Sequence, residues 1–118
     1  MHSYKFQRLE VYQLALEYVD AVYNLSRQLP DSERFNLRSQ VERAATSVVL
    51  NIAEGSTSQS DAEQARFLGL ALRSLLETVA CWDLVSRRTY IRSNELMPIR
   101  EQGHALFVKL QAFRNKLT

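Results

Sequence analysis

The sequence predicts an all-α protein, an antiparallel up-down-up-down four-helix bundle formed as a single domain by residues 1–118. Three observations indicate this fold. The chain has only three glycines and two prolines, too few for the turns of a sandwich or barrel of many short strands. Its apolar residues recur at steps of three and four, which is the spacing of one helix face. A length of 118 residues suits one hydrophobic core.

The first helix is expected over residues 9–28, because one apolar face runs along this segment. The face consists of Val11, Leu14, Tyr18, Val22, Leu25 and Leu29. Pro30 ends the helix, since a proline disfavours helical geometry in the residue before it. A second helix is expected to begin between Glu33 and Phe35 and to end at Glu54. Gly55 then suits the position after the helix, where a left-handed backbone favours glycine.

The third helix is expected over residues 61–88 and has the clearest start in the chain. Ser60 and Glu63 form a capping-box pattern, in which the serine hydroxyl accepts from an amide of the first turn and the glutamate reaches back. Its main apolar stripe is Leu68, Leu72 (or Ala71), Leu75, Val79 and Trp82. This stripe predicts one face packed against the rest of the bundle.

The fourth helix has a heptad seam, which suits packing at about 20° against antiparallel neighbours. The seam is formed by Ile99, Gly103, Leu106, Leu110, Phe113 and Leu117. Ser93 can cap this helix, but Pro98 removes a backbone donor from its early turns. Two starts therefore stay open: an irregular beginning after Ser93, or regular helix from Pro98 onward.

Charge and cysteine content limit the function classes. The formal net charge of +2 is too small to indicate a polyanionic partner by itself, but residues 84–118 carry a net charge of +5 and the rest carries −3. Twelve of the 15 basic residues are arginines, which make planar contacts with phosphate or carboxylate. The single cysteine, Cys81, excludes an intrachain disulfide. We find no signal-peptide pattern and no apolar segment long enough to span a membrane. We therefore expect a cytoplasmic protein without membrane contact.

The second helix is unusual because it is apolar or small over much of its circumference. Its polar stripe consists of Gln40, Arg43, Ser47, Asn51 and Glu54. A broad apolar arc lies beside it, made of Val41, Ala44, Ala45, Val48, Val49 and Ile52, and the other flank carries Ser39, Thr46, Leu50 and Ala53. We infer that this helix packs inside its own bundle and also against another subunit. The alternative is a well-buried core helix in a monomer.

Two groups of polar residues have both a functional and a structural interpretation. The polar stripe can bind a ligand or a nucleic-acid backbone, or it can be a ladder that fixes helix register, with Arg43 pairing to Glu54 or to Glu77. We favour the ladder, because buried polar groups need partners. The cluster formed by Arg87, Arg88 and Arg92 can contact phosphate groups. Alternatively, it can offset the negative end of the third helix, and this is the interpretation that we favour.

The sequence offers no set of convergent catalytic groups. His2 and His104 lack further histidine or cysteine partners at ligand spacing, and a metal site needs three or four ligands. Cys81 lies near the apolar stripe of the third helix and is expected to be a buried, inert thiol. No nucleophile elbow, phosphate loop or dinucleotide fingerprint occurs. We therefore expect no enzyme activity, no metal and no cofactor.

The segment from Gln40 to Gly55, QVERAATSVVLNIAEG, resembles the signature of the bacterial four-helix bundle proteins encoded in intervening sequences of 23S ribosomal RNA genes. The distinctive parts are Arg43-Ala44-Ala45, Ser47 and Asn51–Gly55. Further matches are Phe6, Leu9, Ala15, Leu29-Pro30, Glu33, Phe35, Leu37, Glu63, Phe67-Leu68, Ala71, Ser74-Leu75 and Glu77. The chain departs from the pattern at Asn36, where glycine is usual, at Leu72, where a small residue is common, and in the loop after Gly55, which lacks a common arginine.

This resemblance implies an up-down-up-down bundle that assembles into a ring-like homo-oligomer, a pentamer. The family is also similar to the accessory protein of diversity-generating retroelements, a basic pentameric bundle that binds nucleic acid and a reverse transcriptase. The leading hypothesis is a non-enzymatic scaffold that binds RNA or an RNA-associated protein. One alternative is a protein–protein adaptor without nucleic-acid contact. Another is a small-molecule pocket at the oligomer axis, lined by Arg43, Asn51 and Glu54.

Overall fold

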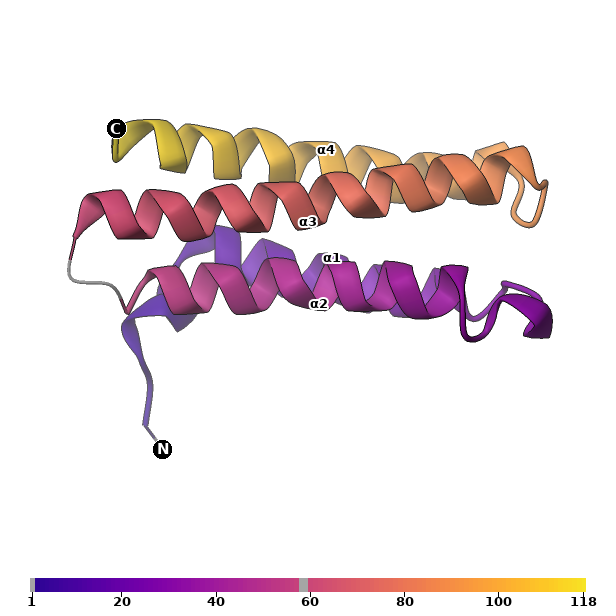
Figure 1. The fold of residues 1–118 in the computed structure, drawn as a ribbon, viewed down its shortest axis with the longest axis horizontal. Coiled ribbons are helices and arrows are strands. Elements are labelled where there is room, and N and C mark those ends of the chain that lie inside the picture. Colours follow the sequence, from indigo (N-terminus) through magenta and orange to yellow (C-terminus); the bar gives the residue numbers. More distant parts are fainter. Residues whose placement is uncertain (1, 58–59) are drawn as a thin grey trace.

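The computed structural model describes residues 2–57 and 60–118, which form four long helices (Figure 1). The helices are α1 (Glu10–Ser26), α2 (Leu37–Gly55), α3 (Asp61–Arg87) and α4 (Ser93–Lys116). Short 3-10 helices, η1 (Lys5–Arg8) and η2 (Asp31–Glu33), precede α1 and α2. The described residues form no strand. The predicted all-α four-helix fold is confirmed.

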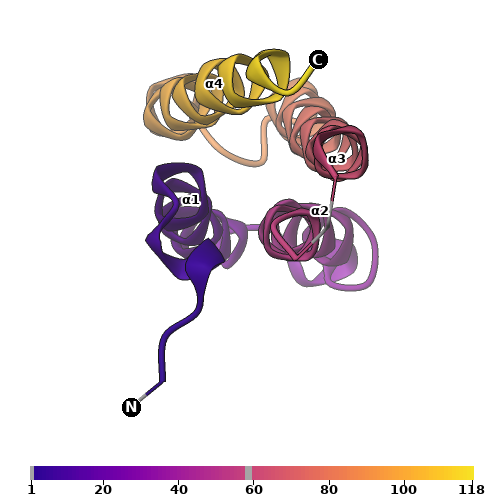
Figure 2. The same ribbon diagram turned by 90° about the vertical axis from the view of Figure 1, so that its left-hand side faces the viewer.

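The four helices occupy the corners of a bundle when viewed end-on (Figure 2). α1 packs against α2 and α4, and α3 packs against the same two helices. The connections lie at alternating ends, which is compatible with the up-down-up-down order (Figure 1). The α1–α2 and α3–α4 connections share one end, which we call the connection end and define as residues 27–36 and 87–95. None of the helices formed by the described residues combines the length and hydropathy of a membrane span.

The helix boundaries follow the sequence prediction closely for α1 and α3, and less closely for α2. α2 begins at Leu37, because the segment before it forms η2 and a turn. The Ser60 cap of α3 is confirmed, since its Oγ accepts from the Glu63 amide at 3.1 Å. The Glu63 carboxylate accepts from Arg66 at 2.6 Å. Ser60 therefore caps α3 while Glu63 forms an ion pair within the first two turns.

The start of α4 differs from both starts that the sequence left open. The helix is continuous from Ser93, with Arg92 as its N-cap residue, and it contains Pro98. Pro98 has no N–H to donate to the carbonyl of Asn94, the residue four positions earlier. Both residues are exposed, so water can bind that carbonyl. A proline is therefore tolerated here without ending the helix.

The core lies between the four helices and contains most of the predicted apolar faces. Its largest fully buried side chains are Trp82, Tyr18, Ile52, Leu68, Leu75, Leu96, Leu106, Leu110, Val22, Val41, Val48 and Val85. The predicted stripe of α3 is wrong at one position. Val79 is 38% exposed, and Thr78 is fully buried in the core. Cys81 is buried, as the sequence predicts, and burial raises the pKa of its thiol.

Gly55 has a different role from the predicted one. It is the last residue of α2, and no glycine among the described residues has a positive φ. A Cβ atom at Gly55 would lie 2.8 Å from the Cβ of Phe67 on α3, closer than two carbon atoms can approach. Gly55 therefore allows α2 and α3 to approach each other where their hairpin closes. The predicted left-handed cap is wrong.

Candidate functional site

The predicted polar stripe follows the side of α2 that adjoins α3. Gln40, Arg43 and Glu54 are exposed, whereas Ser47 and Asn51 are half-buried. The Asn51 amide donates to the backbone carbonyl of Ser47 at 2.9 Å and to its hydroxyl at 3.0 Å. Ser74 of α3 donates to the same hydroxyl at 2.9 Å. These three side chains form a polar link between α2 and α3. Sequence reasoning did not assign Ser74 to this stripe. Ser74 lies one helical turn before Glu77 and therefore on the same face of the third helix, which is the signal that could have assigned it.

The ion pairs that the sequence suggested for Arg43 are wrong. The described residues form four ion pairs: Arg38–Glu42, Arg66–Glu63, Arg100–Asp83 and Lys109–Glu10. None of them includes Arg43, Glu54 or Glu77. Arg43 and Glu54 are eleven positions apart, which separates them by about 16 Å along a helix axis. The middle of the stripe is thus a hydrogen-bonded seam, while its charged members project from the surface.

A second polar network is buried where α1 faces α3. The indole Nε1 of Trp82 donates to the Tyr18 hydroxyl at 3.2 Å, and the hydroxyls of Tyr18 and Thr78 are 2.7 Å apart. Thr78 donates its only proton to the Leu75 carbonyl at 2.6 Å, so Tyr18 donates to Thr78. Burial raises the pKa of Tyr18, which keeps the phenol neutral. The network satisfies its polar groups internally and therefore stabilises the core.

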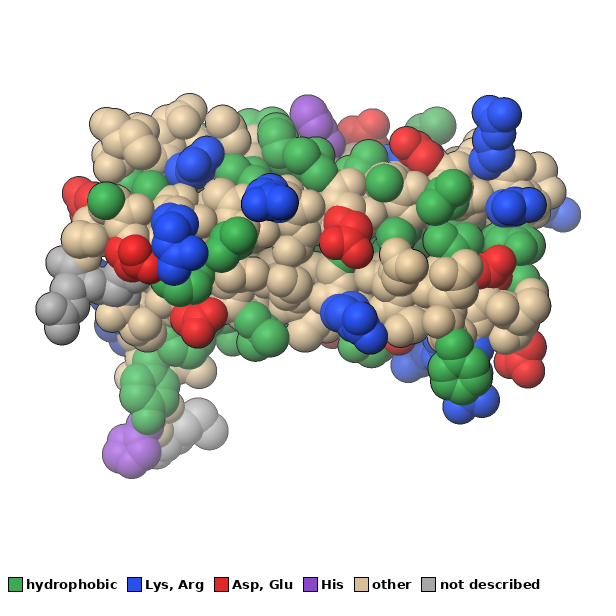
Figure 3. Space-filling view, in the orientation of Figure 1, with side chains coloured by type: hydrophobic (Ala, Val, Ile, Leu, Met, Phe, Trp, Pro, Cys, Tyr) green, Lys and Arg blue, Asp and Glu red, His purple; other side chains and the backbone are tan. Residues whose placement is uncertain are grey.

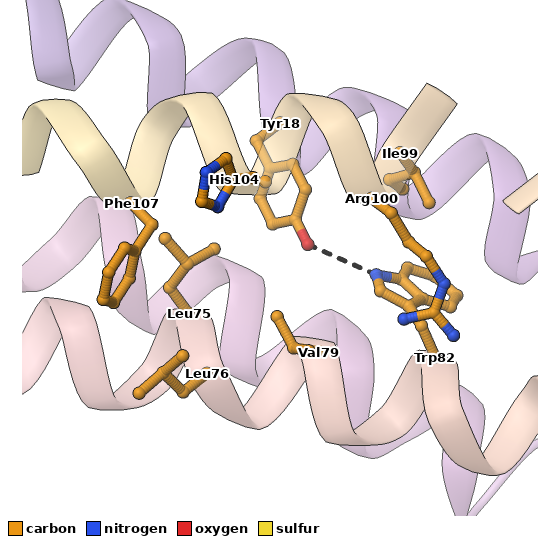
Figure 4. A pocket seen from close by; sticks show the side chains of 10 residues that line it. Tyr18, Leu75, Leu76, Val79, Trp82, Ile99, Arg100, His104 and Phe107 are labelled. Atoms are coloured by element: carbon orange, nitrogen blue, oxygen red, sulfur yellow. Dashed lines mark hydrogen bonds between the residues drawn. The ribbon is translucent and has the colours of Figure 1, made fainter. Parts of the chain in front are cut away.

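A pocket of about 240 Å³ opens between α3 and α4, beside this network (Figure 4). It is lined by Tyr18, Leu75, Leu76, Val79, Trp82, Ile99, Arg100, Gly103, His104 and Phe107. Its Arg100 pairs with Asp83 at 3.0 Å, and the Tyr18 hydroxyl is already bonded. Among the described residues, no three or more histidine, cysteine or carboxylate side chains lie together as a metal site would need. The pocket is a chiefly apolar crevice, and no residue of the polar stripe lines it.

The structure places Arg87, Arg88 and Arg92 at the connection end, and all three are exposed. Arg87 is in the last turn of α3 and Arg88 is its C-cap residue, where a cation offsets the negative end of a helix. Thr89 follows with a φ of 56°, so α3 ends in a left-handed turn without glycine. The amides of Thr89 and Tyr90 donate to the carbonyls of Ser86 and Val85, the pattern of a Schellman motif. This turn fixes where the three arginines project.

A hydrogen bond joins the two connections at this end. The Tyr90 hydroxyl donates to Glu33 at 2.9 Å, and the Asn36 amide donates to the other carboxylate oxygen at 2.9 Å. The bond from Tyr90 is the main reason why the pKa of Glu33 lies below its ordinary value of 4.5, and the bond from Asn36 adds to it. The same bond raises the pKa of Tyr90. Glu33 therefore holds the α1–α2 connection against the α3–α4 connection.

We expect acid to loosen the connection end. Because folding lowers the pKa of Glu33, its contribution to stability is present above the pKa of the unfolded chain and is lost as pH falls through the folded value. An NMR titration of the Glu33 carboxyl carbon should give a pKa below 4.5. In Tyr90→Phe the pKa should rise toward the ordinary value. An unchanged pKa in that variant would show that Tyr90 is not the cause.

Phe35 is a feature of the connection end that sequence reasoning did not assign to any site. Its ring is 87% exposed, and the guanidinium carbon of Arg34 lies 5.2 Å from the ring centroid. An aromatic residue next to an arginine in a loop is the only signal that the sequence gives for it. The exposure itself follows from tertiary structure and could not be predicted.

Comparison with known proteins identifies a family and a structural neighbour of this chain. The family model described as 23S rRNA-intervening sequence protein matches residues 7–112. The chain is similar to the crystal structure of a protein with unknown function from the S23 ribosomal protein family from Bacteroides thetaiotaomicron, with a TM-score of 0.81 and 27% sequence identity. That similarity covers 88% of this chain and 97% of the other. Among curated proteins, none matches the chain.

Proposed function

Since the chain belongs to the family of 23S rRNA-intervening sequence proteins, we propose that it is a non-enzymatic homo-oligomeric scaffold that binds RNA or a ribonucleoprotein partner. We take the pentamer as the expected assembly and the bacterial cytoplasm as its location. The subunit number rests on the family resemblance, and the location rests on the single buried cysteine.

The observation that carries self-association is an apolar face of α3 that the bundle leaves uncovered. Leu76, Ala80 and Leu84 follow each other at four-residue steps, so they share one side of the helix. All three are exposed, the two leucines to 51% each. On α2, Leu50 is 59% exposed. Exposed apolar side chains that share a helix face are typical of surfaces that another chain covers.

The RNA-binding part of the proposal is supported by the distribution of basic residues. Residues 84–118 carry a net charge of +5. Arg87, Arg88 and Arg92 within this region are exposed and lie at one end of the bundle. Exposed arginines at a common end can contact successive phosphates of one strand.

A non-enzymatic role is supported by how the hydroxyl groups of the core are used. Tyr18 and Thr78 bond each other, and Ser26 donates to Glu42 at 2.6 Å. Glu42 also accepts from Arg38 at 3.2 Å. These groups hold helices together, and none of the described buried side-chain polar atoms lacks a hydrogen-bond partner.

Native mass spectrometry of the untagged protein, purified at low salt, tests the proposal. We expect the mass of a closed ring that carries RNA. A Leu76→Glu variant should dissociate into monomers, because it places a charge in the apolar face, whereas Val108→Glu on α4 is the control and should keep the ring. Val108 is 52% exposed, close to the value for Leu76.

Two outcomes would count against parts of this proposal. A ring without nucleic acid would favour the protein–protein adaptor, and replacing Arg87, Arg88 and Arg92 by alanine would then leave partner recovery unchanged. A bare monomer would contradict self-association, and with it our interpretation of the second helix.

A further inference from the structure

The exposure of Phe35 sets it apart from the other apolar side chains of the protein. At 87%, Phe35 is more exposed than any other large hydrophobic residue described, the next being Tyr4 at 61%. A phenylalanine left in water forgoes the favourable transfer of its apolar surface out of water. The Arg34 guanidinium lies over the ring at 5.2 Å from its centroid, and the high exposure leaves much of the ring surface open. Such a ring is accessible to a flat ligand.

The charged groups of the connection end favour an anionic partner. The connection end holds five exposed arginines, Arg27, Arg34, Arg87, Arg88 and Arg92, against the three carboxylates of Asp31, Glu33 and Glu95. None of these arginines takes part in an ion pair with another described residue. Basic side chains project from the right-hand end of the face in Figure 3, where acidic side chains also lie. Of the three carboxylates, Glu33 already accepts hydrogen bonds from Tyr90 and Asn36.

The two connections form a single surface because they are joined. The bond from Tyr90 to Glu33 ties the α1–α2 connection, in which Arg34 and Phe35 directly follow Glu33, to the α3–α4 connection that carries Arg88 and Arg92. Leu29 and Ile91, one from each connection, are buried and anchor the connections to the core. Phe35 and the arginines of the α3–α4 connection thus lie at the same end of the bundle although they are more than fifty positions apart in sequence.

The chemistry of this surface matches an unpaired nucleotide better than a protein or an RNA duplex. Within residues 27–36 and 87–95, Phe35 is the one exposed large hydrophobic side chain, so the exposed apolar area of this surface is small. Bases in an A-form duplex are stacked on each other and present no open face, whereas unpaired bases stack on aromatic rings and guanidinium planes.

Building on the proposed RNA-binding function, we propose that the connection end binds single-stranded RNA, with one unpaired base stacked on Phe35 and neighbouring phosphates contacting Arg27, Arg34, Arg87, Arg88 and Arg92. Phe35 supplies the preference for unpaired bases, because any base can stack on it. The arginines supply the electrostatic affinity, which falls as salt rises.

Fluorescence anisotropy with a labelled oligouridylate, and with a labelled RNA duplex of the same length, tests this surface. We expect tighter binding of the single strand. Phe35→Ala should weaken it by roughly 5- to 150-fold, the usual effect of removing one stacked base contact. Phe35→Trp should retain binding. Val108→Ala, which removes another exposed apolar side chain about 20 Å along α4 from the connection end, is the matched control and should bind as the wild type.

The salt dependence tests the arginines separately. Each phosphate contact to a single strand adds about −0.7 to the slope of log K against log salt concentration. Arg88→Gln and Arg92→Gln should each make the slope shallower by about that amount. Arg8→Gln changes an exposed arginine of η1, at the opposite end of the bundle, and should leave the slope unchanged.

The outcomes separate this inference from the function on which it rests. If the wild type binds neither RNA at low salt, the proposed function itself is wrong. If it binds, but Phe35→Ala binds equally well or the duplex competes equally, the function stands and the stacking site is wrong. If Phe35→Ala changes the ring mass in native mass spectrometry, Phe35 contacts a second copy of the chain, and the inference is overturned.

Discussion

Replacing Tyr18 by phenylalanine should lower the free energy of unfolding by about 1–3 kcal/mol, although it removes a single oxygen atom. The hydroxyl accepts from Trp82 at 3.2 Å and donates to Thr78 at 2.7 Å, and all three side chains are almost fully buried. Without it, the N–H of Trp82, a side chain that is 1% exposed, loses its acceptor. The aromatic ring remains, so its packing against Gly103 is preserved and the effect isolates the hydrogen bonds.

Urea denaturation at one fixed protein concentration would measure this loss, since self-association makes apparent stability depend on concentration. Tyr23→Phe is the matched control. Tyr23 is an exposed residue of the same helix, and its hydroxyl has one long contact, 3.5 Å from Thr46. That variant should differ from the wild type by less than about 0.5 kcal/mol. Equal stability of both variants would show that the buried network contributes nothing.

Replacing Gly55 by alanine should also destabilise the protein, by up to about 2 kcal/mol net. The new methyl group would lie 2.8 Å from the Cβ of Phe67, an atom fixed to the α3 backbone, so the two helices must move apart. Overpacking of this kind costs about 1–3 kcal/mol, and the better helix propensity of alanine returns about 1 kcal/mol or less.

Gly69→Ala is the control for this prediction, because it makes the same substitution within α3. There the new Cβ would lie 3.2 Å from the Arg114 guanidinium, the far end of a flexible side chain that can shift. We expect Gly69→Ala to be neutral or slightly stabilising in the same urea experiment. A Gly55→Ala variant as stable as Gly69→Ala would contradict the close approach of α2 and α3.

Local patterns in the sequence predicted much of this fold because they depend on few positions. Ser60 begins α3 as its sequence neighbours indicate, and the core faces of α1 and α4 follow from residue spacing. Spacing could not decide between Thr78 and Val79, since both lie at helical steps from Leu75. Thr78 is inside because Tyr18 and Leu75 supply partners for its hydroxyl, and Tyr18 belongs to another helix.

The candidate site was less predictable, since its features depend on contacts between distant segments. The role of Gly55 depends on Phe67, which only the α2–α3 hairpin places opposite it. The ion pairs suggested for Arg43 assumed a proximity that the helix geometry does not provide. Phe35 gained its significance from its exposure, which a linear pattern does not contain.

The buried hydrogen bond between Trp82 and Tyr18 also allows the intrinsic fluorescence of the protein to report on its core. Trp82 is the single tryptophan of the chain, is 1% exposed and has its indole N–H bonded to Tyr18. Its emission therefore reports the interior where α1 faces α3, and water that reaches the indole on unfolding would shift the emission to longer wavelengths. Because the indole is buried, we expect a ligand held at the connection end not to contact it. Intrinsic fluorescence can thus distinguish a variant whose core has loosened from one that has lost a surface contact, without any label.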